Sequence, residues 1–161
     1  MSKKLDSLNE TVVKFCGEYP ADFENKDILD LYAGSGSLGI ESLSRGANFV
    51  TFIENSDDCI TILKKNLNEF ENNYKITKSS VDKFLQTSLS TYDIVFYDPP
   101  FKIETDVVKN EVMKIYNILN SDGFVVIHRH TASKELDTLK NYKIHKEKNY
   151  GQSNILILRK L

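Results

Sequence analysis

The chain has 161 residues, of which 40% are hydrophobic and 27% are charged, and its formal net charge is −2. This balance is typical of one globular domain. It excludes a uniformly basic nucleic-acid-binding protein, and no apolar run approaches the roughly 18 residues of a membrane helix. Cys16 and Cys59 form no metal or redox motif, and no secretory signal is visible. We therefore expect a single domain, residues 1–161, in a reduced cytoplasmic setting, with an N-terminal helix and lead-in over residues 1–26.

Short apolar runs alternate with helical patterns along the chain. Strands alternating with helices predict a parallel sheet with helices on both faces. The last two strands are separated by only a short break, which favours an antiparallel hairpin at a sheet edge. The predicted fold class is α/β, Rossmann-like, with a seven-stranded, mostly parallel sheet. Strands are expected at 27–33, 49–53, 74–77, 92–97, 124–127, 142–148 and 155–158, and helices at 37–45, 57–70, 81–85 and 107–119.

A glycine-rich segment joins the first strand to the first helix. Gly34, Gly36 and Gly39 match G-x-G-x-x-G, a loop whose backbone can approach a ligand at a helix N-terminus. Glu54 ends the second strand about 20 residues later, where a carboxylate can accept hydrogen bonds from ribose hydroxyls. Asp82 follows the third strand and can accept a hydrogen bond from an adenine amino group, although a helix N-cap is the alternative. These features fit either NAD or S-adenosylmethionine.

The segment Asp98-Pro99-Pro100-Phe101 directly follows the fourth predicted strand. Two prolines fix φ and remove two N–H donors, so the loop is rigid and rich in acceptors. The Asp98 carboxylate and the Pro99 carbonyl can each accept one N–H of a substrate amine, which holds the nitrogen in line with a sulfonium methyl group. Phe101 can stack on a base, worth ~1–3 kcal/mol; the alternative is a rigid turn with Phe101 in the core. An NAD oxidoreductase leaves this loop unused, so S-adenosylmethionine is favoured.

The order of these motifs resembles class I amino methyltransferases. Residues 30–47, 95–101 and 145–152 resemble the RsmD family of bacterial 16S rRNA guanine-N2 methyltransferases, and the resemblance covers roughly residues 9–161. It implies a class I methyltransferase fold and methyl transfer to guanine N2 of small-subunit rRNA. It also implies catalysis at Asp98, Pro99, Pro100 and Phe101, and binding of S-adenosyl-L-methionine by Asp30, Ala33, Gly34, Ser35, Gly36, Ser37, Gly39, Glu54, Asn55, Asp82 and Asp98. The expected partner is ribosomal RNA or the small ribosomal subunit. We expect a monomer that needs neither a metal nor a membrane.

The chain departs from the family pattern at three places. The family usually begins with a β-hairpin that is absent here, it commonly carries Arg where Asn9 stands, and it often carries Glu where His128 stands. Candidate substrate contacts are Lys102, Arg129 and His130, with a polar strand end as the alternative for Arg129. Alternation places His128 and His130 on one side of their strand and Arg129 on the other.

The distribution of charge along the chain and the identity of the methylated base each leave alternatives open. Residues 101–161 hold 11 Lys or Arg against 7 Asp or Glu, whereas residues 1–100 hold 10 against 16. This asymmetry is either a basic face for phosphates or chance scatter. A DNA adenine-N6 or cytosine-N4 methyltransferase is a second hypothesis, because the same loop serves any exocyclic amine. A non-catalytic RNA-binding or assembly module on this fold is a third.

Overall fold

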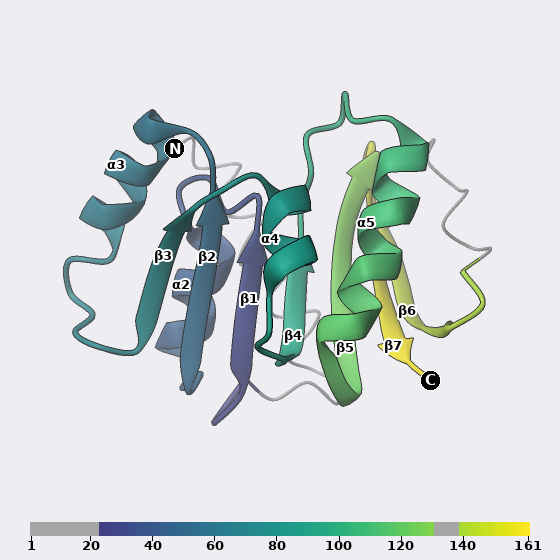
Figure 1. Ribbon diagram of the computed structural model, residues 1–161, viewed down its shortest axis with the longest axis horizontal. Helices are drawn as coiled ribbons and strands as arrows, with labels where there is room; N and C mark the ends of the chain where they lie inside the picture. Colours follow the sequence, from purple (N-terminus) through teal and green to yellow (C-terminus); the bar gives the residue numbers. More distant parts are fainter. Residues whose placement is uncertain (1–22, 131–138) are drawn as a thin grey trace.

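A computed structural model of the chain describes residues 23–130 and 139–161 (Figure 1). Within them, seven strands form one sheet in the order β3-β2-β1-β4-β5-β7-β6. The N-terminal helix expected within residues 1–26 lies largely outside the described residues. The strands are β1 (Asp27–Leu31), β2 (Phe49–Glu54), β3 (Tyr74–Lys78), β4 (Tyr92–Tyr97), β5 (Leu119–His130), β6 (Tyr142–Tyr150) and β7 (Ser153–Lys160). The helices are α2 (Ser37–Ser44), α3 (Asp57–Asn66), α4 (Val81–Thr87) and α5 (Thr105–Ile118).

Strand order and direction determine where a ligand can bind. Strands β1 to β5 are parallel, whereas β7 is antiparallel to both β5 and β6. The chain runs outward from β1 to β3 and then returns to place β4 on the other side of β1. The carboxyl ends of β1 and β4 therefore flank a switch point in strand order, which is where open α/β sheets bind ligands. The predicted fold class, including the antiparallel C-terminal hairpin, is confirmed.

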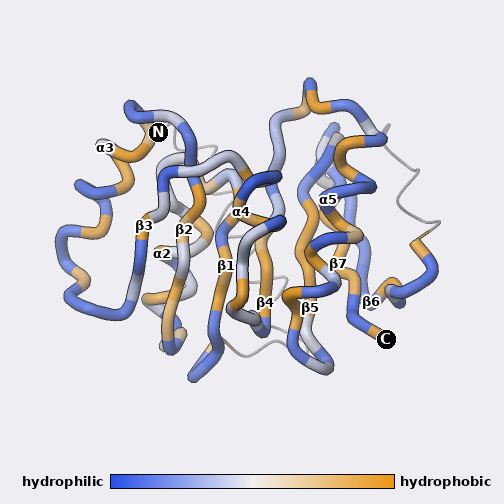
Figure 2. The backbone as a smooth tube through the Cα atoms, in the orientation of Figure 1, coloured by the Kyte–Doolittle hydropathy of each residue, from blue (hydrophilic) through white to orange (hydrophobic). Residues whose placement is uncertain are grey.

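Helices cover both faces of the sheet, α4 and α5 on one face and α2 on the other (Figure 1). Successive residues of each strand point to opposite faces and supply two separate cores. In β4, for example, Phe96 packs in the same core as Leu63 of α3, while Val95 packs in the same core as Val112 of α5. Strands β2, β4 and β7 are largely apolar, whereas the outer strands β3 and β6 carry many polar residues (Figure 2).

Two element boundaries differ by four or more residues from those predicted. Helix α3 ends at Asn66 rather than residue 70, and the chain then turns so that the Phe70 N–H donates to the Leu67 carbonyl at 2.9 Å. Strand β5 starts at Leu119, five residues before the expected start at residue 124. The added segment is irregular, because Asp122 has a φ of 65° and the register with β4 shifts between Leu119 and Phe124. None of the helices in the described residues is long and apolar enough to cross a membrane.

Candidate active site

The glycine loop after β1 lies tightly against its neighbours. Gly36 has a φ of 83°, a conformation that residues with a Cβ rarely adopt, and a Cβ there would collide with Leu63 of α3. A Cβ on Gly39 would collide with Phe52 of β2. The Asn66 side chain of α3 also donates to the Ser35 carbonyl at 2.9 Å. The glycines therefore allow the loop and the start of α2 to approach the sheet closely.

Two carboxylates hold this loop in place. Asp30, which is buried, accepts a hydrogen bond from the Gly39 N–H at 3.0 Å. Glu54 Oε1 accepts from the Gly34 N–H at 2.8 Å, and its Oε2 accepts from the N–H groups of Asn55 and Ser56, both at 2.9 Å. Each carboxylate oxygen has two lone pairs, so Glu54 keeps some capacity for a ligand. Asp30 and Glu54, which were predicted to bind the cofactor, therefore also fix the conformation of the glycine loop.

Two adjoining hollows open at the carboxyl edge of the sheet, and Tyr32 lines both of them. None of the described residues that line them is Lys or Arg. A larger hollow of about 730 Å³ lies at the opposite edge, where β1, β2 and β4 begin, away from the predicted motifs. The first hollow, of about 160 Å³, is lined by Asp30, Tyr32, Ala33, Gly34, Ser35, Ser37, Leu38 and Asp98. The second, of about 260 Å³, is lined by Tyr32, Ile53, Glu54, Asn55, Ser79, Ser80, Val81, Asp82, Ile103, Val107 and Glu111.

The site is acidic. Burial raises the pKa of Asp30 well above its usual range, although the hydrogen bond from Gly39 opposes this shift. The nearby carboxylates of Asp98 and Glu54 raise the pKa of Asp30 further. A cationic ligand relieves this repulsion, whereas an anionic diphosphate increases it. In the described part of the chain no group of His, Cys, Asp and Glu side chains could hold a metal ion.

Half-buried Tyr32 and buried Glu111 form a pair that the sequence did not reveal. Tyr32 has a φ of 56°, unusual for a residue with a side chain, and its hydroxyl donates to Glu111 Oε1 at 2.6 Å. Burial raises the pKa of Glu111, a shift that the hydrogen bond from Tyr32 partly offsets. The sequence analysis named neither residue as part of the site. Nothing in the spacing of a lone tyrosine and a lone helical glutamate marks them as partners.

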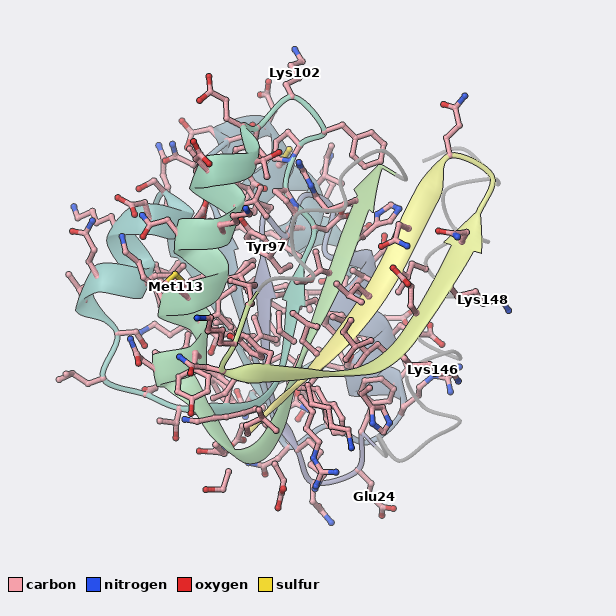
Figure 3. All side chains as sticks on the ribbon, turned by 90° about the vertical axis from the view of Figure 1, so that its right-hand side faces the viewer. Glu24, Tyr97, Lys102, Met113, Lys146 and Lys148 are labelled. Atoms are coloured by element: carbon pink, nitrogen blue, oxygen red, sulfur yellow. The ribbon has the colours of Figure 1, made fainter. Side chains whose placement is uncertain are left out.

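The Asp98 loop faces the glycine loop across the first hollow. Asp98 lies beside His128, with 3.0 Å between Asp98 Oδ1 and His128 Nδ1. The Ile103 N–H donates to the Pro100 carbonyl at 3.0 Å and closes the turn. Phe101 is 51% exposed, so the alternative that buried it in the core is wrong. Lys102 lies exposed at the tip of the loop, as Figure 3 shows. The loop thus presents an acceptor and an aromatic ring beside the hollow.

A family model described as "Conserved hypothetical protein 95" matches residues 4–159. Ribosomal RNA small subunit methyltransferase D of Haemophilus influenzae is 33% identical over 151 residues, which cover 91% of this chain and 76% of the relative. The protein of the same name from Escherichia coli is 30% identical over 154 residues, 91% of this chain and 73% of the relative. The chain belongs to the RsmD family.

The structure comparison agrees with this assignment. A solved structure of a proposed methyltransferase, yhhF of Escherichia coli, superposes on this RsmD-family chain with a TM-score of 0.84 at 26% identity. The match covers 99% of this chain and 88% of the other. The resemblance drawn from the sequence is therefore confirmed, and the fold is that of class I methyltransferases.

One predicted substrate contact of this RsmD-family member lies differently from expectation. Arg129 is 3% exposed and faces α5, with its Nη2 3.5 Å from the Ile103 carbonyl. This burial does not favour the expected contact with a phosphate, because the alternation of β5 turns Arg129 into a core. The side chain of His130 lies outside the described residues.

Asp82 is not the N-cap that was its alternative role. Ser80 caps α4 by accepting from the Lys83 N–H at 3.2 Å. Asp82 instead accepts from Lys114 Nζ at 2.7 Å and from the Gln86 side chain at 2.8 Å, and it lines the second hollow. Its carboxylate therefore remains a candidate for contacting a ligand there.

Proposed function

We propose that this chain transfers a methyl group from S-adenosyl-L-methionine to an exocyclic amino nitrogen of a base in ribosomal RNA, with guanine N2 as the target. The observation that carries the proposal is the shared hollow, because Asp98 and the glycine loop line it together. The relatives named ribosomal RNA small subunit methyltransferase D support ribosomal RNA as the substrate class. A cytoplasmic monomer acting on the small ribosomal subunit or its RNA is consistent with this role.

The residues of the two hollows fit the cofactor. When bound, S-adenosyl-L-methionine supplies an electrophilic methyl group on a positively charged sulfur. Glu54 and Asn55 would hold the ribose, and Asp82 would contact the adenine side of the second hollow. The acidic lining around Asp30 and Asp98 suits a sulfonium cation, whereas the diphosphate of NAD would meet repulsion. An NAD oxidoreductase also leaves the Asp98 loop without a role.

The Asp98 loop would position the target amine. The Asp98 carboxylate accepts one N–H of the amine and the Pro99 carbonyl accepts the other, which aims the nitrogen lone pair at the methyl group. Methyl transfer to a neutral amine moves a positive charge onto the nitrogen, and the resulting ammonium is strongly acidic. A strong general base is therefore unnecessary, and positioning is the main catalytic task. Phe101 stacks on the base and holds it against the loop.

The test is transfer of labelled methyl from S-adenosyl-L-methionine to purified nucleic acids. We expect label in ribosomal RNA or in small ribosomal subunits, and none in genomic DNA of the same source. Label in DNA alone would support the adenine-N6 or cytosine-N4 alternative. Absence of transfer to every substrate would support the non-catalytic module. In parallel, S-adenosyl-L-methionine should raise the melting temperature and NAD should not.

Replacing Phe101 with Ala should raise KM for RNA several-fold, because stacking on a base is worth ~1–3 kcal/mol. Cofactor affinity should stay near the wild-type value, since Phe101 lines neither hollow. Phe101→Tyr is the matched control and should be mild, because the stacking surface survives. Steady-state kinetics with RNA as the varied substrate measure both effects. An unchanged KM in the alanine variant would remove the stacking role.

The preference for S-adenosyl-L-methionine over S-adenosyl-L-homocysteine should grow as the pH rises. The pKa of Asp30 is raised above its ordinary value of 3.8, so its carboxyl loses its proton only at higher pH. The ionised form attracts a sulfonium cation, whereas the neutral thioether of S-adenosyl-L-homocysteine gains little. The adenosine and amino-acid groups are common to both ligands, so pH effects on these groups cancel in the ratio of the two affinities.

Calorimetry with both ligands between about pH 5 and 8 measures this ratio. It should rise several-fold and level off once Asp30 is fully ionised. Asp30→Asn is the control and should flatten the pH dependence of the ratio. A ratio that stays constant in the wild-type protein would contradict the proposed electrostatic match.

A further inference from the structure

His128 stands beside Asp98 because of the register between two parallel strands. Tyr97, the last residue of β4, pairs with Ile127 of β5, so the next positions, Asp98 and His128, are neighbours. Phe96 and Val126, two residues before each, pack in the core on the α2 side of the sheet, so Asp98 and His128 share that side. The result is the 3.0 Å separation of Asp98 Oδ1 and His128 Nδ1, with 14% of the His128 side chain exposed.

The hydrogen bond assigns the proton on the imidazole ring. An ionised carboxylate can only accept, so His128 Nδ1 carries the hydrogen and donates it to Asp98. His128 Nε2 is buried and has no hydrogen-bond partner in the described structure. A hydrogen on Nε2 would therefore be a buried donor without an acceptor, which proteins avoid. The tautomer with its hydrogen on Nδ1 makes the hydrogen bond to Asp98 and avoids a buried, unpaired donor at Nε2.

The same ring also touches Phe101. The Phe101 and His128 ring centroids are 5.7 Å apart and the planes meet at 71°, an edge-to-face contact. Phe101 is half exposed, so part of its ring remains open to an incoming base. His128 thus contacts both side chains of the loop that would hold the target base. It links the Asp98 loop to the end of β5.

We propose that His128 is a positioning residue that sets the Asp98 carboxylate and the Phe101 ring for the incoming base. This inference rests on the proposed methyl transfer. By donating to Oδ1, His128 fixes the carboxylate and leaves Oδ2 to accept an N–H of the amine. Through its edge-to-face contact with Phe101, His128 also sets the orientation of the Phe101 ring on which the base would stack. The sequence analysis placed His128 on one side of its strand but assigned it no role.

Variants at His128 separate the two contacts. The amide nitrogen of Asn lies as many bonds from Cα as Nδ1 of His, whereas that of Gln lies one bond farther, as Nε2 does. His128→Leu and His128→Gln should lower kcat by about tenfold or more, because Asp98 loses its donor. His128→Asn should stay within about threefold of wild-type kcat. All three variants should raise KM for RNA several-fold, because the contact with the Phe101 ring is lost.

Cofactor affinity and melting temperature of the variants should stay near wild type, which separates positioning from a loss of fold. Wild-type kcat and KM in His128→Leu would overturn the proposal, as would equal losses of kcat in the Asn and Gln variants. If the variants fail to fold, nitrogen-15 NMR of the wild-type imidazole still decides: hydrogen on Nδ1 supports the proposal and hydrogen on Nε2 overturns it. The proposed function itself fails separately, when the wild-type chain transfers no methyl group or Asp98→Ala retains the full rate.

Discussion

Replacing Asp98 with Ala should lower the rate of methyl transfer by about 10²-fold or more, while cofactor and RNA binding stay near wild type. Asp98 is not part of the core, since 37% of its side chain is exposed and its carboxylate contacts His128. Its loss should therefore leave the fold intact and remove the contact that aligns the amine. A 10²-fold loss corresponds to about 2.7 kcal/mol of barrier, which is reasonable for one positioning contact in the reacting geometry.

Asp98→Asn distinguishes positioning from proton abstraction. Asn keeps one carbonyl acceptor, so Asp98→Asn should retain more activity than Asp98→Ala. A carboxylate can accept from His128 with one oxygen and from the amine with the other, whereas the amide of Asn has only one acceptor oxygen. An obligatory proton acceptor predicts instead that Asn is as inactive as Ala. Single-turnover methylation at saturating cofactor measures both variants. Wild-type rates in both would make Asp98 a structural residue at the end of its strand.

Replacing Glu54 with Ala should weaken binding of S-adenosyl-L-methionine by about tenfold or more. A hydrogen bond to a charged group contributes ~1.5–3 kcal/mol, and Glu54 would offer its carboxylate to the ribose. The substitution also leaves the N–H groups of Gly34, Asn55 and Ser56 without their acceptor. The glycine loop should therefore become less ordered, which adds to the loss of affinity.

Glu41→Ala is the matched control for Glu54. Glu41 lies on α2, the helix that directly follows the glycine loop. Its carboxylate pairs with Arg45 one turn away, at 3.2 Å. An exposed pair of this kind contributes little, so cofactor affinity should not change. Calorimetry that finds wild-type affinity in a folded Glu54→Ala variant would remove the ribose assignment.

The sequence predicted those parts of the fold that depend on local patterns. Strand β4 has the bounds expected from its apolar run, and the Asp98 loop follows it directly. The G-x-G-x-x-G loop has a clear physical reason, because Gly36 and Gly39 approach Leu63 and Phe52 too closely for a Cβ. Such features are predictable because the residues that mark each of them lie within a short stretch of the chain.

The rest depends on register and on which face of an element points inward. The contact between Asp98 and His128 joins residues 30 positions apart and follows from the alignment of β4 with β5. The alternation of side chains along β5 turns Arg129 toward α5, where it is buried. Likewise, the pairing of Tyr32 with Glu111 depends on how α5 crosses the sheet. No motif within the sequence reports any of these three arrangements.

The most direct test of the proposed chemistry is the identity of the methylated nucleoside. Small-subunit ribosomal RNA that lacks the modification would be incubated with the chain and S-adenosyl-L-methionine, digested to nucleosides and analysed by mass spectrometry. We predict N2-methylguanosine with the wild-type chain and none above background with Asp98→Ala. Methylation of adenine or cytosine, of a ring carbon or of a ribose, or equal yields from both proteins, would contradict the proposal.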